Sequence, residues 1–224
     1  MRFYEFKQLN KIPLTEGARI EHLEDLVFRE FPPSKGANRA LQSLINLEKG
    51  GHTNVTIKWD GSPAIIFGRD GDGNFILTDK SGFTAKGYDG RATSAKDLQA
   101  MLMNRPGAQR DPEGYGQFAA NMADIYNEYE KATPKDYRGF FKGDLLYFNT
   151  PVAEGGDYVF KPNIVEYRVA QTSELGKKIG KSKTGIVIHR EVDAEGKEGP
   201  LKNGNIFQGE EVLVVGRASC RERV

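Results

Sequence analysis

The sequence predicts an α+β protein whose core is a mainly antiparallel β-sheet with helices at its flank. Two observations carry this prediction. Several segments repeat apolar residues with the spacing of an amphipathic helix, while others are short runs of β-branched and aromatic residues. The short runs are separated by turn sequences rich in Gly, Asp and Asn, which favour hairpins and therefore antiparallel neighbours.

Two helices are predicted before the sheet. Residues 20–31 place apolar side chains on one helical face, and a proline pair ends the pattern. A second helix is expected from Ser34, a suitable N-cap, to Leu47, and a glycine pair follows it. We expect the apolar faces of both helices to pack on a core rather than to bind a partner.

The first strands flank a tight hairpin. Residues 55–57 alternate as a strand does, and residues 64–68 form a second apolar run. Residues 69–74 read Arg-Asp-Gly-Asp-Gly-Asn, a strong hairpin signal, and a returning strand is expected over residues 75–79.

Helices return in the middle of the chain, over residues 95–103 and 115–132. From Tyr137 onward strand signals dominate. This part includes the strand-like stretch 163–169 and a charged hairpin over residues 193–199.

Composition excludes several classes of protein. The only cysteine is Cys220, so the sequence predicts neither disulfides nor thiolate metal sites. The formal net charge is +1, which gives no support for nucleic-acid binding by overall charge. No apolar run approaches the roughly 20 residues that span a bilayer. We therefore expect a soluble protein of the cytoplasm that does not enter a membrane.

Three parts are expected along the chain: an N-terminal leader and helical segment over residues 1–50, the sheet domain over 51–215, and a tail over 216–224. The tail resembles the translation of a common short-read sequencing adapter, so we expect it to replace the true end of the protein. A natural basic tail is the alternative.

One segment suggests chemistry rather than architecture. Lys58 ends a β-branched run and is followed by Trp59, Asp60 and Gly61. This is the form K-x-D-G, in which a glycine lets the backbone approach a phosphate. By itself the tetrapeptide is weak evidence for a reactive lysine, because its three fixed residue types occur by chance in about a few per cent of chains of this length.

Further motifs, in a fixed order along the chain, strengthen the interpretation of the K-x-D-G segment as a reactive site. The returning strand ends at Lys80, and Lys86 is a second basic candidate. Residues 140–144 read Phe-Phe-Lys-Gly-Asp, close to the pattern F-x-G-E with Asp144 in place of glutamate. Residues 184–189 approach the pattern E-G-x-V-x-K.

On these motifs the chain resembles the covalent nucleotidyltransferase superfamily, which holds the ATP-dependent DNA and RNA ligases and the mRNA capping enzymes. The resemblance implies an adenylation core of the ligase type, similar to ATP-grasp proteins, with Lys58 as the nucleophile. It also implies nucleotide contacts at Asp60, Gly61, Lys80, Lys86, Asp144, Gly185 and Val187. ATP and Mg²⁺ or Mn²⁺ would be the cofactors, and Asp144 a metal ligand.

The chain departs from the superfamily at two places. Thr184 stands where a glutamate is expected and His189 where a lysine often falls, which puts the usual metal scheme in doubt; Glu166 is a candidate substitute. A final K-x-K motif is missing. Longer strings such as residues 77–90 resemble proteins without an assigned activity from large tailed phages of marine bacteria, whose proteins work in the host cytoplasm.

Two functions follow as expectations. The first is a monomeric, ligase-like enzyme that forms lysyl-AMP and seals RNA or DNA ends. The second is an inactive descendant on the same fold that binds nucleotide or belongs to the virion. A basic run supplies the candidate nucleic-acid contacts Lys177, Lys178, Lys181 and Lys183, although such a run is more often a solvated loop.

Overall fold

The computed structural model describes residue 26 and residues 31–49, 59–84 and 92–216. The chain divides into two compact units, Met1–Thr53 and Asn54–Val224. None of the helices in these described ranges is long and apolar enough to cross a bilayer.

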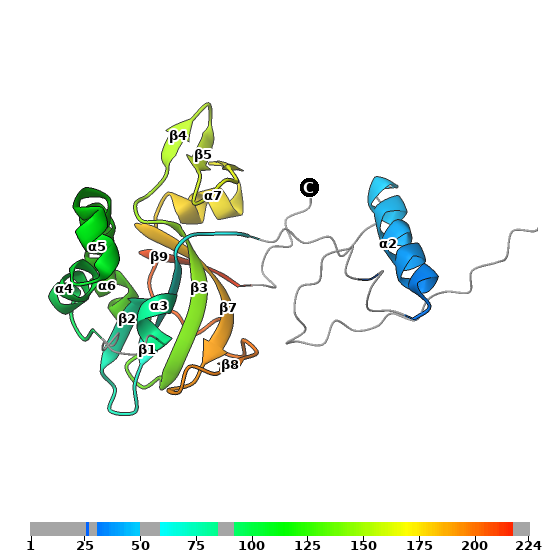
Figure 1. Cartoon of the computed structure of the whole chain (residues 1–224). Coiled ribbons are helices and arrows are strands. Elements are labelled where there is room, and N and C mark those ends of the chain that lie inside the picture. The colour runs from blue at the N-terminus through cyan, green and yellow to red at the C-terminus, as the bar shows by residue number, and fades with distance from the viewer. Residues whose placement is uncertain (1–25, 27–30, 50–58, 85–91, 217–224) are drawn as a thin grey trace, which may run out of the picture. The chain divides into compact units, whose positions relative to one another are not determined.

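In the first unit the structure describes one helix, α2 (Pro33–Glu48), shown in blue in Figure 1. It confirms the helix predicted from Ser34 to Leu47. Its side chains Leu41 and Leu44 are about half exposed. The helix predicted over residues 20–31 and the strand predicted over residues 55–57 lie largely or wholly outside the described residues.

The second unit is built on a six-stranded sheet in the order β2-β1-β3-β7-β8, with β9 paired to the same edge of β7 as β8. The pairs are antiparallel except β7 with β9. The strands are β1 (Ala64–Arg69), β2 (Phe75–Asp79), β3 (Gly139–Tyr147), β7 (Thr184–Val192), β8 (Glu198–Gly199) and β9 (Val212–Gly216). The predicted fold class, a mainly antiparallel sheet with flanking helices, is confirmed.

A second, three-stranded sheet is formed by β4 (Val152–Glu154), β5 (Asp157–Phe160) and β6 (Tyr167–Ala170), with the short helix α7 (Glu174–Ile179) beside it (Figure 1). One prediction fails in part here. Residues 163–166 are not a strand, since β6 begins only at Tyr167. The first part of the basic run lies in α7, and the rest follows it.

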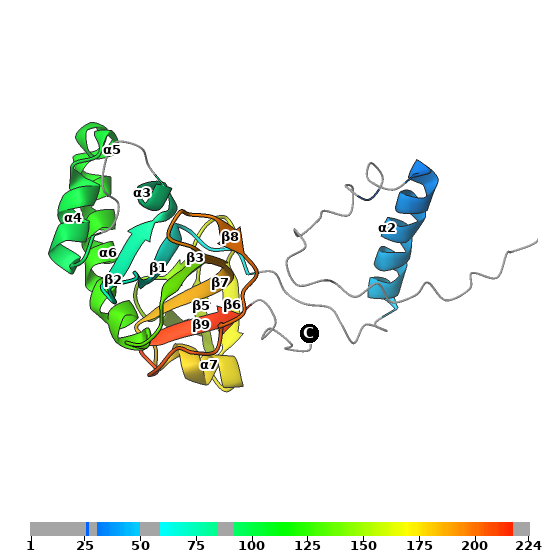
Figure 2. The ribbon, with the colours of Figure 1, turned by 90° about the horizontal axis from the view of Figure 1, so that it is seen from below.

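Helices cover one face of the large sheet. Figure 2 shows α4 (Ala95–Met103) and α6 (Pro112–Ala132) on one side of the strands, and α5 (Pro106–Arg110) connects the two helices. The predicted helix over 95–103 is confirmed. The other starts three residues before the predicted Tyr115, because the Asp111 side chain caps α6 and Pro112 fits its first turn.

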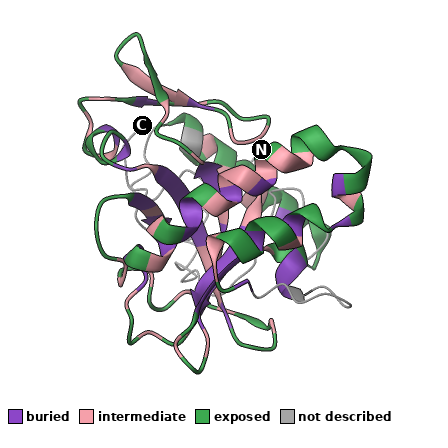
Figure 3. Ribbon diagram, turned by 90° about the vertical axis from the view of Figure 1, so that its left-hand side faces the viewer, coloured by how far each residue is buried: buried purple, intermediate pink, exposed green. Residues whose placement is uncertain are grey.

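The main core lies between these helices and the sheet. Alternate residues of β1, β2, β3, β7 and β9 belong to this core, among them Phe67, Phe141 and Ile186, all fully buried. Figure 3 shows the buried positions on the strands and on the inner sides of the helices, with exposed positions outward. The alternation means that the other face of the sheet carries a separate set of side chains.

Arg69 ties the sheet to the end of α6. This buried side chain, at the end of β1, donates to the carbonyl oxygens of Glu130, Thr133 and Pro134 at 3.0–3.2 Å. The last carbonyls of a helix lack partners within the helix and carry partial negative charge, so a guanidinium there satisfies and stabilises them.

Candidate functional site

The motif that contains Lys58 is described from its second residue onward. Lys58 and Lys86 lie outside the described residues. Trp59 is buried, and its ring lies 4.6 Å from the ring of Tyr167 and stacks 6.2 Å from that of Phe160. The small sheet therefore anchors the chain directly after Lys58.

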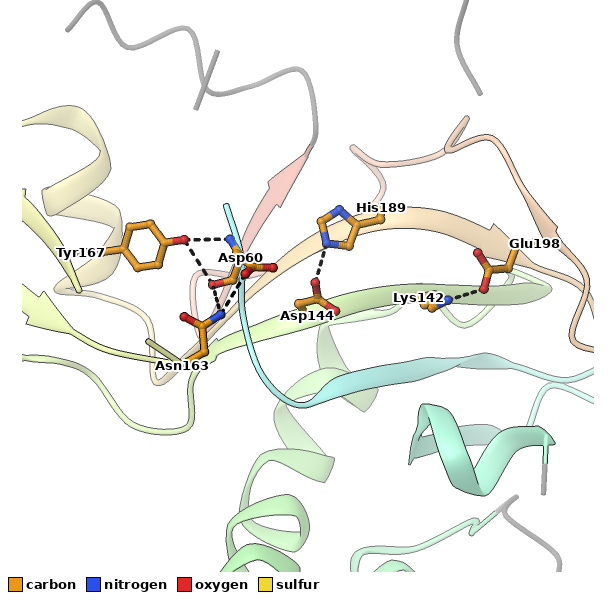
Figure 4. A network of polar contacts seen from close by, with 7 residues as sticks. All are labelled: Asp60, Lys142, Asp144, Asn163, Tyr167, His189 and Glu198. Atoms are coloured by element: carbon orange, nitrogen blue, oxygen red, sulfur yellow. Dashed lines mark hydrogen bonds and ion pairs between the residues drawn. The ribbon is translucent and has the colours of Figure 1, made fainter. Parts of the chain in front are cut away.

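Asp60 is fixed by the same small sheet. Its backbone N–H donates to the Tyr167 hydroxyl at 2.8 Å, and the Asn163 side-chain amide donates to its carboxylate at 3.1 Å (Figure 4). One carboxylate oxygen of Asp60 is thus already hydrogen-bonded, and the orientation of the side chain is set.

Gly61 extends the pairing of β1 with β3. The N–H of Ser62 donates to the Leu145 carbonyl at 2.8 Å, and the N–H of Leu145 donates to the Pro63 carbonyl at 3.0 Å. A Cβ on Gly61 would lie 2.3 Å from that Leu145 oxygen. The glycine is therefore required by the approach of two strands, whatever it also does for a ligand.

Asp144 and His189 form a pair on the face of the sheet opposite the long helices. The Nε2 of His189 lies 2.9 Å from Asp144 Oδ2, and each side chain is 23% exposed (Figure 4). Asp144 is the pairing partner of Ala64 on β1 and of Val187 on β7. The three segments that carry the motifs are therefore neighbouring strands.

A β-bulge lies beside the Asp144–His189 pair. Lys142 pairs with Arg190 and Gly143 with Ile188, so His189 is an extra residue between the two pairs. Bulges re-aim side chains and are frequent beside functional sites. Alternation along β7 places His189 on the same face as Val187, and the bulge adds Arg190 to that face as the pairing partner of Lys142.

Lys142 lies two residues before Asp144 and so faces the same side of the sheet. Its ammonium forms an ion pair with Glu198 of β8, which Figure 4 shows beside the Asp144–His189 pair. The hydrogen bond from Lys142 and the charges of Lys142, Lys80 and Arg190 hold the pKa of Glu198 below its usual value, against a rise from partial burial.

These polar residues form a strip between two apolar clusters. On one side lies a cluster around Phe83 of α3 (Lys80–Thr84), with Phe140 and Val192. On the other side lies the cluster around Trp59 and the small sheet. We name the residues between them the polar strip: Lys142, Asp144, His189, Arg190 and Glu198.

Two of three further expected nucleotide contacts have packing roles. Val187 is buried in the cluster with Trp59, and a Cβ on Gly185 would meet the Tyr147 ring at 2.5 Å. Lys80 is the exposed first residue of α3, and its charge acts on Glu198. Of the three, Lys80 is the one with an exposed, charged side chain.

Thr184 faces away from the polar strip. It is fully buried, and its hydroxyl donates to the Tyr147 carbonyl at 2.8 Å. It belongs to the same alternating set as Ile186 and Ile188, which pack on the helices. A carboxylate here would be buried without a partner at high cost, which explains a threonine at this position.

The expected metal ligands do not meet. Glu166 is about half exposed and accepts from Arg168 at 2.8 Å, at the start of β6. Across the described ranges, no three His, Cys, Asp or Glu side chains are grouped as metal ligands would be. Mg²⁺ needs only one or two protein carboxylates when substrate phosphates supply the rest, and Asp144 fits that requirement.

The basic run is largely paired with acids. Lys177, Lys181 and Lys183 lie 3.0–3.5 Å from carboxylates of Glu174, Glu210 and Glu128. These pairs lower the net positive charge of the run.

A cavity of about 310 Å³ opens beside Lys178 and Lys181, and it is lined on its other side by β9 and the loop before it. It shares no residue with the polar strip.

Sequence reasoning missed Lys142, Asn163, Tyr167, Arg190 and Glu198. Lys142 carried a usable signal, because residues two apart on a strand share a face and Asp144 was already a candidate. The other four come from segments far away in the chain, and no local pattern connects them to Lys58.

The polar strip and the two sheets define a class: an α+β protein with a charged site on the sheet face opposite its long helices. Residues 18–198 match the sequence profile of a family of unknown function, DUF6267, and the chain belongs to that family. Searches of curated proteins and of solved structures each returned no match.

Proposed function

We propose that this protein is an ATP-dependent, ligase-like nucleotidyltransferase with Lys58 as its nucleophile. One observation carries the proposal: the segment that follows Lys58 runs into β1, beside β3 with Asp144 and β7 with His189. Three motifs far apart in the chain thereby reach neighbouring strands, in agreement with the motif order of the nucleotidyltransferase superfamily. The specific fold of that superfamily is part of the proposal.

The reaction asks a lysine to act as a nucleophile. A lysine ammonium with a pKa near 10.4 is almost fully protonated at pH 7, so Lys58 has to lose a proton before it attacks. Nearby cations favour that loss, and Lys80, Lys142 and Arg190 supply positive charge on this side of the sheet. Lys58 Nζ then bonds to the α-phosphorus of ATP, the bond to the bridging oxygen breaks, and pyrophosphate leaves.

The other residues orient the nucleotide. Asp60 is held by Asn163 and Tyr167, so its second carboxylate oxygen can bind a ribose hydroxyl or an ammonium group. Asp144 would hold Mg²⁺ together with the nucleotide phosphates. The metal supplies charge stabilisation at the phosphate. His189 holds the Asp144 carboxylate in position. The acceptor of the nucleotidyl group, under this proposal, is an RNA or DNA end.

A second function rests on Thr184. Because this position is buried on the helix side of β7, the chain lacks a carboxylate that the superfamily uses. This favours a descendant that binds nucleotide, or serves in a virion, without forming the adduct. The two functions differ in one product, the covalent lysyl nucleotide.

Intact mass spectrometry of the full chain, incubated with Mg²⁺ and ATP or GTP, tests the proposal. We expect a mass gain of one nucleoside monophosphate in the wild type and in Lys135→Ala, which removes an exposed lysine on another part of the unit. We expect none in Lys58→Ala. A folded wild type that gains no mass with either nucleotide would leave the second function in place.

A further inference from the structure

The strand β9 lies at an edge of the large sheet but has the composition of an interior strand. Among the described strands it pairs with β7 alone, so its other edge has no strand beside it (Figure 2). Natural edge strands are usually protected by charged residues, prolines or bulges. Residues 212–215 are all apolar, and their register with β7 is regular. Uncharged β-branched runs of this kind are typical of strands with a neighbour on each side.

The backbone of β9 presents hydrogen-bonding groups at this open edge. The carbonyl oxygen of Glu211 accepts from the N–H of Thr184 at 3.2 Å, so Glu211 faces β7. Because successive residues of a strand turn their N–H and C=O groups to opposite edges, those of Val212 and Val214 face away from β7. The loop that leads into β9 bonds elsewhere, since its Gln208 N–H donates to the carbonyl of the last residue of α6.

The cavity of about 310 Å³ lies along the same edge. Three consecutive residues of β9 line it, Val212, Leu213 and Val214. Consecutive side chains of a strand point to opposite faces of the sheet, so a cavity that touches three in a row lies against the edge of the strand. A Cβ on Gly209, in the loop that also lines the cavity, would meet no atom within 4 Å. There is therefore open space beside the outward N–H and C=O groups.

The cavity differs in chemistry on the two faces of β9. Leu213 shares an apolar cluster with Ile179 of α7, so α7 and its Lys178 lie toward that face. Phe207 packs with Val212 in the main core, on the opposite face. A strand added at this edge would therefore turn alternate side chains toward a lysine and toward an aromatic ring.

Lys178 is the basic group that an added strand would meet. It is exposed, and among the described residues it has no ion-pair partner. Glu174, one helical turn earlier, lies 3.0 Å from Lys177, and Lys178 acts on it through its charge alone. Lys181, which also lines the cavity, is paired with Glu210 at 3.0 Å. The charge at this wall therefore favours an acidic side chain opposite Lys178.

We propose that the open edge of β9 binds an extended peptide segment of a partner protein, which adds a strand to the sheet and alternates apolar with acidic side chains. Main-chain hydrogen bonds with Val212 and Val214 supply affinity, and the two faces of the cavity set the alternation. The apolar side chains face Phe207, and an acidic side chain pairs with Lys178. The inference goes beyond the proposed function, since the cavity shares no residue with the polar strip.

Fluorescence anisotropy tests this surface, with the full chain titrated into a short labelled peptide that alternates valine with glutamate. We expect saturable binding by the wild type. Lys178→Glu should weaken it on the order of tenfold, because an attraction becomes a repulsion. Lys177→Glu is the matched control, since it makes the same change of charge on the same helix at a lysine that does not line the cavity. It should weaken binding by no more than about twofold.

Two further peptides separate main-chain pairing from attraction between side chains. Each keeps the sequence of the first but carries methyl groups on one of the two alternating sets of amide nitrogens. The peptide that loses the donors facing β9 should not bind, while the other should bind as the unmodified peptide does. Hydrogen exchange followed by NMR locates the contact, because the N–H groups of Val212 and Val214 should exchange more slowly when the unmodified peptide is present.

Four results would overturn the inference. A folded wild type that shows no saturable binding at millimolar peptide would mean that the edge is closed or is filled by the chain or a second copy of it. Equal binding by both methylated peptides would exclude an added strand. Equal losses in Lys178→Glu and Lys177→Glu would exclude the contact with Lys178. A peptide that alternates valine with lysine and binds as tightly would exclude an acidic partner.

Discussion

Gly61 lies against the backbone of β3 with no room for a side chain. A Cβ there would come within 2.3 Å of the Leu145 carbonyl oxygen, which belongs to a paired strand and cannot turn aside. We expect Gly61→Ala to lower the free energy of unfolding by about 2 kcal/mol, within the cost of overpacking. Urea unfolding followed by the fluorescence of the buried Trp59 measures the loss.

Gly71 is the matched control for this substitution. No atom lies within 4 Å of a Cβ placed on it, at the tip of the β1–β2 hairpin. Gly71→Ala should change the free energy of unfolding by less than about 0.5 kcal/mol. Equal losses at both glycines would contradict the steric explanation for Gly61.

Asp144 supplies a different prediction at the scale of one residue. Asp144→Asn keeps the size of the side chain and a hydrogen-bond partner for His189 but removes the negative charge. We expect the rate of adduct formation to fall about 100-fold, as it does when one charge-stabilising group is removed from an active site. Single-turnover mass spectrometry gives the rate.

Asp72→Asn controls for the loss of one negative charge, because Asp72 is exposed on the β1–β2 hairpin. The free energy of unfolding of both variants should stay within about 1 kcal/mol of the wild type, since the Asp144–His189 pair is partly exposed. An unchanged rate in Asp144→Asn would exclude Asp144 from the reaction.

At the scale of elements, Asp79 joins three of them. Its carboxylate, at the end of β2, accepts from the N–H of Gly82 in α3 at 3.0 Å. It also accepts hydrogen bonds from both terminal nitrogens of Arg105, the N-cap residue of α5. The distance from Arg105 Nη1 to Asp79 Oδ2 is 2.8 Å. Both side chains are nearly buried, at 8% and 13% exposed. The pair therefore holds α3 and the start of α5 against the sheet.

Removal of Arg105 should leave a buried charge without its partner. We expect Arg105→Ala to lower the free energy of unfolding by about 3 kcal/mol, as is typical when one member of a buried pair is deleted. Arg110→Ala, at the exposed end of α5, should cost less than about 0.5 kcal/mol. Urea titration of both variants gives the comparison, and similar losses in the two would refute a special role for the Asp79 pair.

At the scale of the whole molecule, buried tyrosines link stability to pH. Burial raises the pKa of Tyr147 to about 12, against a smaller lowering by its hydrogen bond with Ser182. Burial also raises the pKa of Tyr126, Tyr129 and Tyr137. The folded protein therefore holds these protons more tightly than the unfolded chain, in which the pKa is near 10.0.

The stability from these tyrosines is fully present below pH 10 and is lost as the pH rises toward 12. We expect the urea midpoint to fall steadily between these pH values. In Tyr147→Phe the midpoint should be lower at pH 8, where a hydrogen bond is missing, but should fall less steeply above pH 10. A parallel decline in the two proteins would show that Tyr147 ionises at its ordinary pKa.

Much of the fold could be predicted from local patterns. The helix over residues 95–103, the strand over 75–79 and both hairpins appear where spacing and turn residues indicate them. The strand predicted over residues 163–169 was wrong in its first half, because β-branched and aromatic residues also suit an extended loop. In that loop the Asn163 side chain donates to the Asp60 carboxylate and accepts from the N–H of Val165. The small helix α7 was missed because six residues are too few to show a helical period.

Less of the candidate site could be predicted. Asp144 was found through its motif, and Lys142 shares its face by simple alternation. The packing roles of Gly61 and Gly185 could not be told from ligand binding in the sequence, since a glycine that lets a phosphate approach and one that lets a strand approach look alike. The burial of Thr184 on the helix side of β7 could not be told either. Glu166 was a reasonable carboxylate in sequence, but it lies beside Arg168 instead.

The sequence by itself determined the class of fold, the turns and the order of the motifs, because periodicity and turn chemistry depend on residues close together in the chain. Only the tertiary structure decided which side chains share a face. The register of β3 with β7 brings His189 to Asp144, and the return of β8 brings Glu198 to Lys142. Strand register and strand order set these contacts, and both depend on the packing of the whole sheet.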